Sequence, residues 1–136
     1  YSGEKLQLSY RKSVYSGLDY VITSAKFELS QGEPQKIWER MKEYMSRREA
    51  KQPLEYPSAG SIFKRPEGQY AGTLIEQCGL KGIQIGGARV SEKHAGFIVN
   101  TGGATCEDVE SLIHLIQETV EKKTGYFLEC EVRSIS

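Results

Sequence analysis

The segment from Thr105 to Gly125 carries the most complete helix pattern in this chain. Thr105 is a residue type that caps helix N-termini, and Asp108 follows three positions later, close to a capping-box arrangement. Gly125 supplies a natural C-terminal stop. Between these ends a stripe of apolar residues recurs at helical spacing: Val109, Leu112, Ile113, Ile116 and Val120. The pattern therefore predicts an amphipathic helix with one apolar face.

Short segments of strand and helix character surround this helix. In chain order they are a short strand within the loop 53–70, a helix over Ala71–Cys78, and strands over Ala88–Val90, Phe97–Val99, Tyr126–Cys130 and Val132–Ile135. We expect a turn near Lys93–His94 between the second and third of these strands. Because strands and helices do not alternate regularly, the sequence predicts an α+β fold, a small antiparallel or mixed sheet packed against helices.

The first third of the chain divides near residue 32. Tyr20–Leu29 alternates apolar and polar residues, which predicts a strand. Pro34 suits a first helical turn, and the next residues place an apolar face on a helix that ends before Pro53: Ile37, Trp38, Met41, Tyr44 and Met45. We expect one unit over residues 1–32 and a second over residues 33–136.

The composition argues against several classes of partner. The 18 Lys and Arg residues balance 18 Asp and Glu residues, so neither nucleic acid nor a membrane surface is expected as a partner. No apolar run approaches the roughly 20 residues of a membrane span. The three cysteines are widely spaced, which argues against a disulfide framework or a metal site and favours a reducing compartment, the cytoplasm.

The first candidate site is the loop Ser58–Pro66. Gly60 lets the backbone approach a ligand closely, and the Ser61 hydroxyl precedes two cations, Lys64 and Arg65, that suit an anionic substrate. An ordinary turn with solvated cations explains the same residues.

Two further candidates have equally plain alternatives. The glycine-rich stretch 82–103 contains His94, and dense glycine either contacts phosphate or makes tight turns. This stretch has neither a Rossmann fingerprint nor a P-loop. Glu131 falls between two apolar segments, either on a solvent face or buried near a reaction centre as an acid with a raised pKa.

An ordered set of segments resembles the MurB reductase family over nearly the whole chain. The segments are Tyr10–Ser13, Lys51–Leu54, Ser58–Phe63, Ala71–Glu76, Gly79–Gly82, Ile85–Ala88, Lys93–Phe97 and Glu131–Arg133. The resemblance implies a substrate-binding C-terminal domain over 33–136, with residues 1–32 as the tail of a flavin-binding domain whose FAD-holding segments are not in this sequence. It also implies NADPH as hydride donor, FAD as cofactor and UDP-N-acetylglucosamine enolpyruvate as substrate.

The resemblance also assigns roles to particular residues. Ser61 matches the family's proton donor and Glu131 the glutamate beside the substrate carboxyl group, so these two are the expected catalytic residues. Tyr10 matches a substrate-binding tyrosine, and the remaining expected substrate ligands are Arg48, Lys64, Arg65 and His94. No metal is expected. A UDP-sugar-binding module without catalysis and an inert assembly domain remain the alternatives.

Overall fold

The computed structural model describes residue 1 and residues 3–134, and the chain divides into two compact units, Tyr1–Pro34 and Gln35–Ser136. The first unit contains one short 3-10 helix, η1 (Gly3–Leu6), and a tight turn closed by the bridge between Ser9 and Lys12. The assignment of this unit to a flavin-binding domain stays a prediction.

The strand predicted over Tyr20–Leu29 is wrong for the described chain. Residues 20–29 form neither helix nor strand in the part of the chain that the structure describes, and their alternating side chains are exposed, 88% for Val21 and 84% for Leu29. An extended segment becomes a strand only when its backbone N–H and C=O groups pair with a neighbour. The alternating pattern of residues 20–29 indicates a tendency to pair, but no partner strand lies among the described residues.

The predicted helix after residue 33 is confirmed as α1 (Pro34–Lys51), with Arg48 and Lys51 in its last turn. Glu39 accepts a hydrogen bond from Gln35, and Glu43 forms an ion pair with Arg47, each across one helical turn. No residue of α1 is buried. Its apolar face exists as the spacing predicted, but it is covered by nothing in the described structure.

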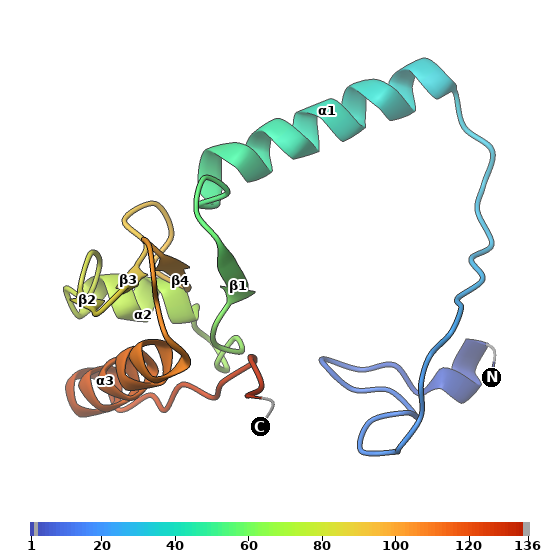
Figure 1. Cartoon of the computed structure of the whole chain (residues 1–136). Helices are drawn as coiled ribbons and strands as arrows, with labels where there is room; N and C mark the ends of the chain where they lie inside the picture. The colour runs from blue at the N-terminus through green and yellow to red at the C-terminus, as the bar shows by residue number, and fades with distance from the viewer. Residues whose placement is uncertain (2, 135–136) are drawn as a thin grey trace. The chain divides into compact units, whose positions relative to one another are not determined.

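The second unit is built on a four-stranded antiparallel sheet in the order β1-β4-β3-β2 (Figure 1). The strands are β1 (Ser58–Ser61), β2 (Gln84–Ile85), β3 (Ala88–Val90) and β4 (Phe97–Asn100). The predicted pair at 88–90 and 97–99 is confirmed, and the turn that joins its strands contains Lys93 and His94. The register shifts within β1, where Gly60 adopts a φ of +85° that favours glycine.

Helices α2 (Ala71–Gln77) and α3 (Cys106–Thr124) pack against each other, and α3 also packs against β2 and β3. The buried stripe of α3 joins residues of the sheet in one core, whose fully buried members include Ile62, Ile75, Val90, Leu112, Ile116 and Leu128. Thr105 and Asp108 form the predicted capping box, and Gly125 ends α3 with a φ of 77°. The predicted α+β class is confirmed.

Residues 53–57 anchor the chain between α1 and β1. Pro53 is buried, the C=O of Pro57 accepts from the N–H of Asn100 at 2.9 Å, and Glu55 lies 3.5 Å from the Lys93 ammonium. Residues 53–57 are thereby tied to β4 and to the turn before it.

The two strands predicted after α3 are wrong. Residues 126–129 and 131–134 lie outside any strand, and Ile135 lies outside the described residues. The segment makes one antiparallel bridge, Phe63 with Cys130, and buries Leu128. Leu128 packs in the core, and the pairing of the segment around Cys130 is too short to count as a strand.

Candidate functional site

Three segments far apart in the sequence meet at Ile62. Its N–H donates to the C=O of Gly96 at 3.0 Å, and its C=O accepts from the N–H of Glu131 at 2.8 Å. Lys64 continues the second contact, because its N–H donates to the C=O of Glu129 at 2.8 Å. Residue 61 is therefore the chain neighbour of Ile62, whose backbone is hydrogen-bonded to both Glu131 and Gly96.

Ser61 is the last residue of β1 and is exposed, paired in register with Phe97. Its Oγ donates to the C=O of Phe63 at 3.3 Å, a long hydrogen bond that a ligand can replace. Glu131 is half-buried. The structure thus brings together the backbones of the two residues predicted to be catalytic, one with an accessible hydroxyl and one partly withdrawn from water.

Gly96 contacts Ile62 through its C=O and His94 through its N–H. The imidazole Nδ1 accepts from the N–H of Gly96 at 3.1 Å, and the ring meets Phe97 edge to face, with centroids 5.0 Å apart. Ser91, which is buried, accepts from the N–H groups of Lys93 and His94 at 3.1 and 3.2 Å. His94 is therefore half-buried and hydrogen-bonded within the predicted turn.

Lys64 and Arg65 follow the serine but point to different partners. The Lys64 ammonium forms an ion pair with Glu129, and its side chain is 33% exposed. The Arg65 guanidinium lies over the ring of Tyr70, 4.0 Å from the centroid, a cation–π contact. A diphosphate would therefore have to compete with Glu129 for Lys64.

The last two predicted ligands, Tyr10 and Arg48, belong to other segments of the sequence than those that meet at Ile62. Tyr10 belongs to the first unit and is 59% exposed. Arg48 lies in the last turn of α1, where its Nε donates to the side chain of Gln52 at 2.9 Å. Their roles as substrate ligands stay predictions.

The glycine turn at Gly86–Gly87 does not fit the phosphates of a dinucleotide. The N–H of Gly87 donates to Asp108 Oδ2 at 3.2 Å, and a Cβ at Gly87 would lie 2.4 Å from the backbone nitrogen of Ala104. A phosphate loop presents free N–H groups to open space, whereas this turn faces a carboxylate and touches backbone. Tight packing, the alternative left open by the sequence, explains this part of the glycine-rich stretch.

The same contact acts on Asp108. Backbone hydrogen bonds from Thr105 and then from Gly87 lower the pKa of this carboxyl group below its ordinary value. Asp108 therefore has a structural role: it caps α3 and fixes the turn between β2 and β3.

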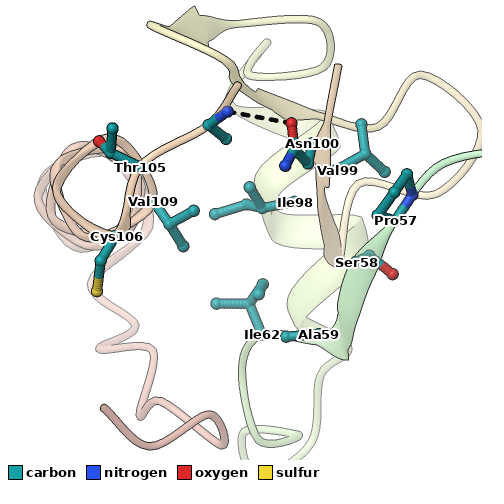
Figure 2. Close-up of a pocket in the computed structure, with 11 residues that line it drawn as sticks. Pro57, Ser58, Ala59, Ile62, Ile98, Val99, Asn100, Thr105, Cys106 and Val109 are labelled. Atoms are coloured by element: carbon teal, nitrogen blue, oxygen red, sulfur yellow. Dashed lines mark hydrogen bonds between the residues drawn. The ribbon is translucent and has the colours of Figure 1, made fainter. Parts of the chain in front are cut away.

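An apolar cavity of about 390 Å³ opens between β1 and the first turn of α3. Figure 2 shows Pro57, Ser58 and Ala59 on one side, Thr105, Cys106 and Val109 on the other, with Ile62 and Ile98 between them. The side-chain oxygen of Asn100 accepts from the N–H of Ala104 at 3.1 Å and holds the loop before α3 (Figure 2). None of the predicted site residues lines this cavity, but Ile62 does, so the cavity adjoins the junction at its apolar side.

Other kinds of site receive little support from the part of the chain that is described. No group of three or more His, Cys, Asp or Glu residues there could hold a metal ion. None of its helices combines the length and the apolar character needed to cross a membrane. The three cysteines are free, and burial raises the pKa of the Cys130 thiol.

Sequence reasoning missed two glycines at this junction. A Cβ at Gly96 would lie 3.0 Å from Cε1 of His94 and 3.8 Å from Ser61 Oγ. A Cβ at Gly72, on α2, would lie 3.3 Å from both His94 Cε1 and the backbone nitrogen of Gly96. Neither glycine has a positive φ, so no turn pattern marks it, and only the tertiary contact with the histidine ring reveals its importance.

The fold and the junction define an α+β domain that presents a strand-end serine beside a histidine turn and a C-terminal glutamate. Residues 52–135 match the family model described as UDP-N-acetylenolpyruvoylglucosamine reductase, C-terminal domain. The chain belongs to this family, the C-terminal domain of the MurB reductases.

Individual relatives agree with the family match. The chain is 54% identical over 134 residues to a UDP-N-acetylenolpyruvoylglucosamine reductase of Exiguobacterium sibiricum, covering 98% of this chain and 44% of the relative. A reductase of the same name from Clostridium perfringens is 52% identical over 132 residues, covering 97% and 43%. The crystal structure of MurB from Thermus caldophilus superposes with a TM-score of 0.78 at 35% identity, covering 96% of this chain and 46% of that one.

The chain therefore spans less than half the length of the curated relatives that it matches. The family match fixes the fold and the kind of domain.

Proposed function

We propose that this chain is the substrate-binding part of a reductase that converts UDP-N-acetylglucosamine enolpyruvate to UDP-N-acetylmuramate in peptidoglycan precursor synthesis. The observation that carries the proposal is the junction at Ile62, which joins Ser61, Gly96 and Glu131 within the segment that matches the family. Relatives at 52–54% identity bear the name of this reductase.

The chemistry of the reaction explains why a serine and a glutamate belong at one place. Reducing an enolpyruvyl double bond adds a hydride to one carbon and leaves enolate character on the other, beside the carboxylate. That second carbon needs a proton donor and an electrostatic environment matched to the developing charge. In our proposal the Ser61 hydroxyl delivers the proton, and Glu131 lies beside the carboxyl group and the protonated carbon.

A serine hydroxyl is a weak acid, so its position decides whether it can act. Ser61 Oγ is accessible and loosely bonded to the Phe63 C=O at 3.3 Å, so it can turn to the substrate without losing a strong hydrogen bond. Precise placement supplies much of the rate enhancement of such a group. The hydrogen bonds of Ile62 to the Gly96 and Glu131 segments hold the adjacent backbone.

The anionic part of the substrate needs cations. We propose Arg65, Lys64 and Arg48 as ligands of the diphosphate, with Tyr10 as a further contact to the substrate. Arg65 is proposed because its guanidinium lies over Tyr70, close to Lys64 in the chain, and because a guanidinium matches phosphate geometry. Lys64 would exchange its ion pair with Glu129 for the phosphate.

We further propose FAD and NADPH as the redox cofactors of the complete enzyme, which we place in the cytoplasm. The glycine turn of this domain is packed against α3 and does not fit their phosphates. In the proposal residues 1–32 form the tail of the flavin-binding domain that holds the FAD.

The test uses the complete protein that contains this sequence, with Ser61→Ala and the matched control Ser58→Ala from the same strand. Loss of a general acid costs typically 10²–10⁴-fold in rate. We expect Ser61→Ala to lower NADPH oxidation that depends on UDP-N-acetylglucosamine enolpyruvate by at least about a hundredfold, while Ser58→Ala stays close to wild type. Calorimetric binding of the substrate should survive in both variants.

The alternative outcomes are distinct. Equal rates in Ser61→Ala and wild type would overturn the role of Ser61. Substrate binding without any substrate-dependent NADPH oxidation in the wild-type protein would favour the UDP-sugar-binding module. Absence of binding as well would favour the assembly domain.

A further inference from the structure

We propose that His94 is a positioning residue, whose neutral imidazole holds Gly96 against the strand end that carries Ser61. The proposal rests on the proposed function for the role of Ser61, and it replaces a direct contact of His94 with substrate by an indirect one. The geometry that carries it is a chain of contacts from the imidazole through Gly96 to Ile62, the residue next to the serine.

The hydrogen bond to Gly96 fixes the protonation state of the ring. A backbone N–H can only donate, so Nδ1 of His94 accepts at 3.1 Å and carries no proton. The proton of the neutral ring is then on Nε2. A charged imidazolium would place an N–H against the N–H of Gly96 and would break the contact.

The turn around the ring leaves little freedom for Gly96. Ser91 Oγ accepts from the N–H of His94 at 3.2 Å, and the N–H of Phe97 donates to the C=O of His94 at 3.0 Å. The ring also packs edge to face on Phe97. These hydrogen bonds hold the backbone of His94, and Phe97 holds its ring. Nδ1 therefore acts as a fixed acceptor that sets where the Gly96 backbone lies.

Gly96 transmits this position to the serine. Its C=O accepts from the N–H of Ile62 at 3.0 Å, and a Cβ placed on it would lie 3.2 Å from His94 Nδ1 and 3.8 Å from Ser61 Oγ. The ring and the hydroxyl therefore flank the same Cα. A shift of Gly96 by the loss of its acceptor moves the backbone that pairs with the end of β1.

Two glycines provide the space that the ring occupies. Cβ atoms at Gly72 and Gly96 would lie 3.3 and 3.0 Å from His94 Cε1, closer than ordinary van der Waals contact. Neither glycine has a positive φ that would require it for backbone reasons. Their smallness is explained by the ring, and the three residues form one unit.

The test compares His94→Asn with His94→Ala in the complete protein. Asparagine keeps an acceptor oxygen near the position of Nδ1 and has nothing at the position of Nε2, while alanine has neither. A small misplacement of reacting groups can cost about a hundredfold in rate. We expect His94→Ala to lower kcat at least about tenfold, with KM within about threefold of wild type. His94→Asn should keep most of the wild-type kcat.

A residue that binds substrate directly gives the opposite pattern. If His94→Ala mainly raises KM and His94→Asn is as impaired as alanine, His94 is a substrate ligand and the proposal is overturned. Wild-type kinetics in His94→Ala overturn it as well.

A second measurement is independent of turnover. Nitrogen NMR of the imidazole should show an unprotonated, hydrogen-bonded Nδ1, and the Gly96 amide should exchange with solvent slowly in wild type and His94→Asn but faster in His94→Ala. Similar exchange in all three proteins contradicts the proposal. If no protein, wild type included, turns over the enolpyruvyl substrate, the proposed function fails, and the amide data still decide whether His94 holds Gly96.

Gly72→Ala keeps the proposal testable if His94→Ala does not fold. Alanine is favoured over glycine within a helix, so a loss of stability in Gly72→Ala reports the contacts of the added Cβ with the ring and with the backbone nitrogen of Gly96. We expect the loss to shrink when Gly72→Ala is combined with His94→Asn, which removes Cε1. Equal losses in both backgrounds show that the ring does not require the glycine.

Discussion

Helices α1 and α3 have nearly the same length, 18 and 19 residues, and each carries an apolar stripe that the sequence reveals by its spacing. Their surroundings differ completely. Four residues of the α3 stripe are buried, whereas Trp38 and Met41 of α1 are 60% and 55% exposed. Helical periodicity thus predicts a helix and its apolar face, but the partner that covers the face is a property of the tertiary structure.

The largest expected effect comes from the buried stripe. Leu112→Ala removes a side chain that is 0% exposed, and we expect the free energy of unfolding of this chain to fall by about 2–5 kcal/mol. Urea unfolding followed by circular dichroism measures the change. A loss below roughly 1 kcal/mol would contradict the packing of α3 against the sheet.

The second effect concerns the close approach of Gly87 to the loop that precedes α3. Among the described residues, α1 has no comparable contact at its start. Gly87→Ala would place a Cβ 2.4 Å from the backbone nitrogen of Ala104 and 2.6 Å from the C=O oxygen of Gly102. Overpacking of this kind costs about 1–3 kcal/mol. Gly68→Ala is the control: its φ of +71° strains an alanine, but nothing lies within 4 Å. An unfolding free energy lowered no more by Gly87→Ala than by Gly68→Ala would refute the close approach.

A smaller effect tests the capping box of α3. Thr105→Ala removes the acceptor for the N–H of Asp108, and loss of an N-cap side chain costs typically about 1 kcal/mol. This loss should appear at neutral pH, because the hydroxyl does not titrate there. Unchanged urea unfolding of Thr105→Ala would mean that the cap contributes nothing.

Asp108 gives the same cap a dependence on pH. Its pKa is lowered in the folded chain, so its contribution to stability is complete above the unfolded value of about 3.9 and is lost as pH falls through the lower folded value. Asp108→Asn should therefore flatten the decline of stability with acid in that window. An identical acid profile for wild type and Asp108→Asn would show that the carboxylate hydrogen bonds do not favour folding.

The smallest effect is expected on α1. Met41→Ala in this 136-residue chain should change the free energy of unfolding by no more than about 0.5 kcal/mol, since the side chain is 55% exposed. The comparison with Leu112→Ala is the measurement that matters. A loss for Met41→Ala as large as that for Leu112→Ala would show that the face of α1 is covered.

Much of the second unit was predictable because local chemistry decides it. Thr105, Asp108 and Gly125 mark the ends of α3, and the segments 88–90 and 97–99 pair as their apolar patterns indicated. The two failures have different causes. Residues 20–29 have strand-like composition but no partner strand among the described residues, whereas the segment after α3 pairs with residues 62–64 only around Cys130, too briefly for a strand.

The candidate site was predictable only in its parts. Ser61 and Glu131 came from the resemblance, and the structure joins their neighbourhoods through Ile62. The hydrogen bond of His94 to Gly96 and the space left by Gly72 depend on contacts between a turn, a strand end and a helix. Such contacts link residues as far apart in the chain as Ser61 and Gly96, or Ile62 and Glu131, and no local pattern encodes them.

The most direct measurement is a crystal structure of the complete protein with UDP-N-acetylglucosamine enolpyruvate bound. We expect the enolpyruvyl carbon that receives the proton to lie about 3–3.5 Å from Ser61 Oγ, with the Glu131 carboxylate beside the substrate carboxyl group. An enolpyruvyl group whose reacting carbon is bound beyond the reach of Ser61 Oγ would contradict the assignment of the site.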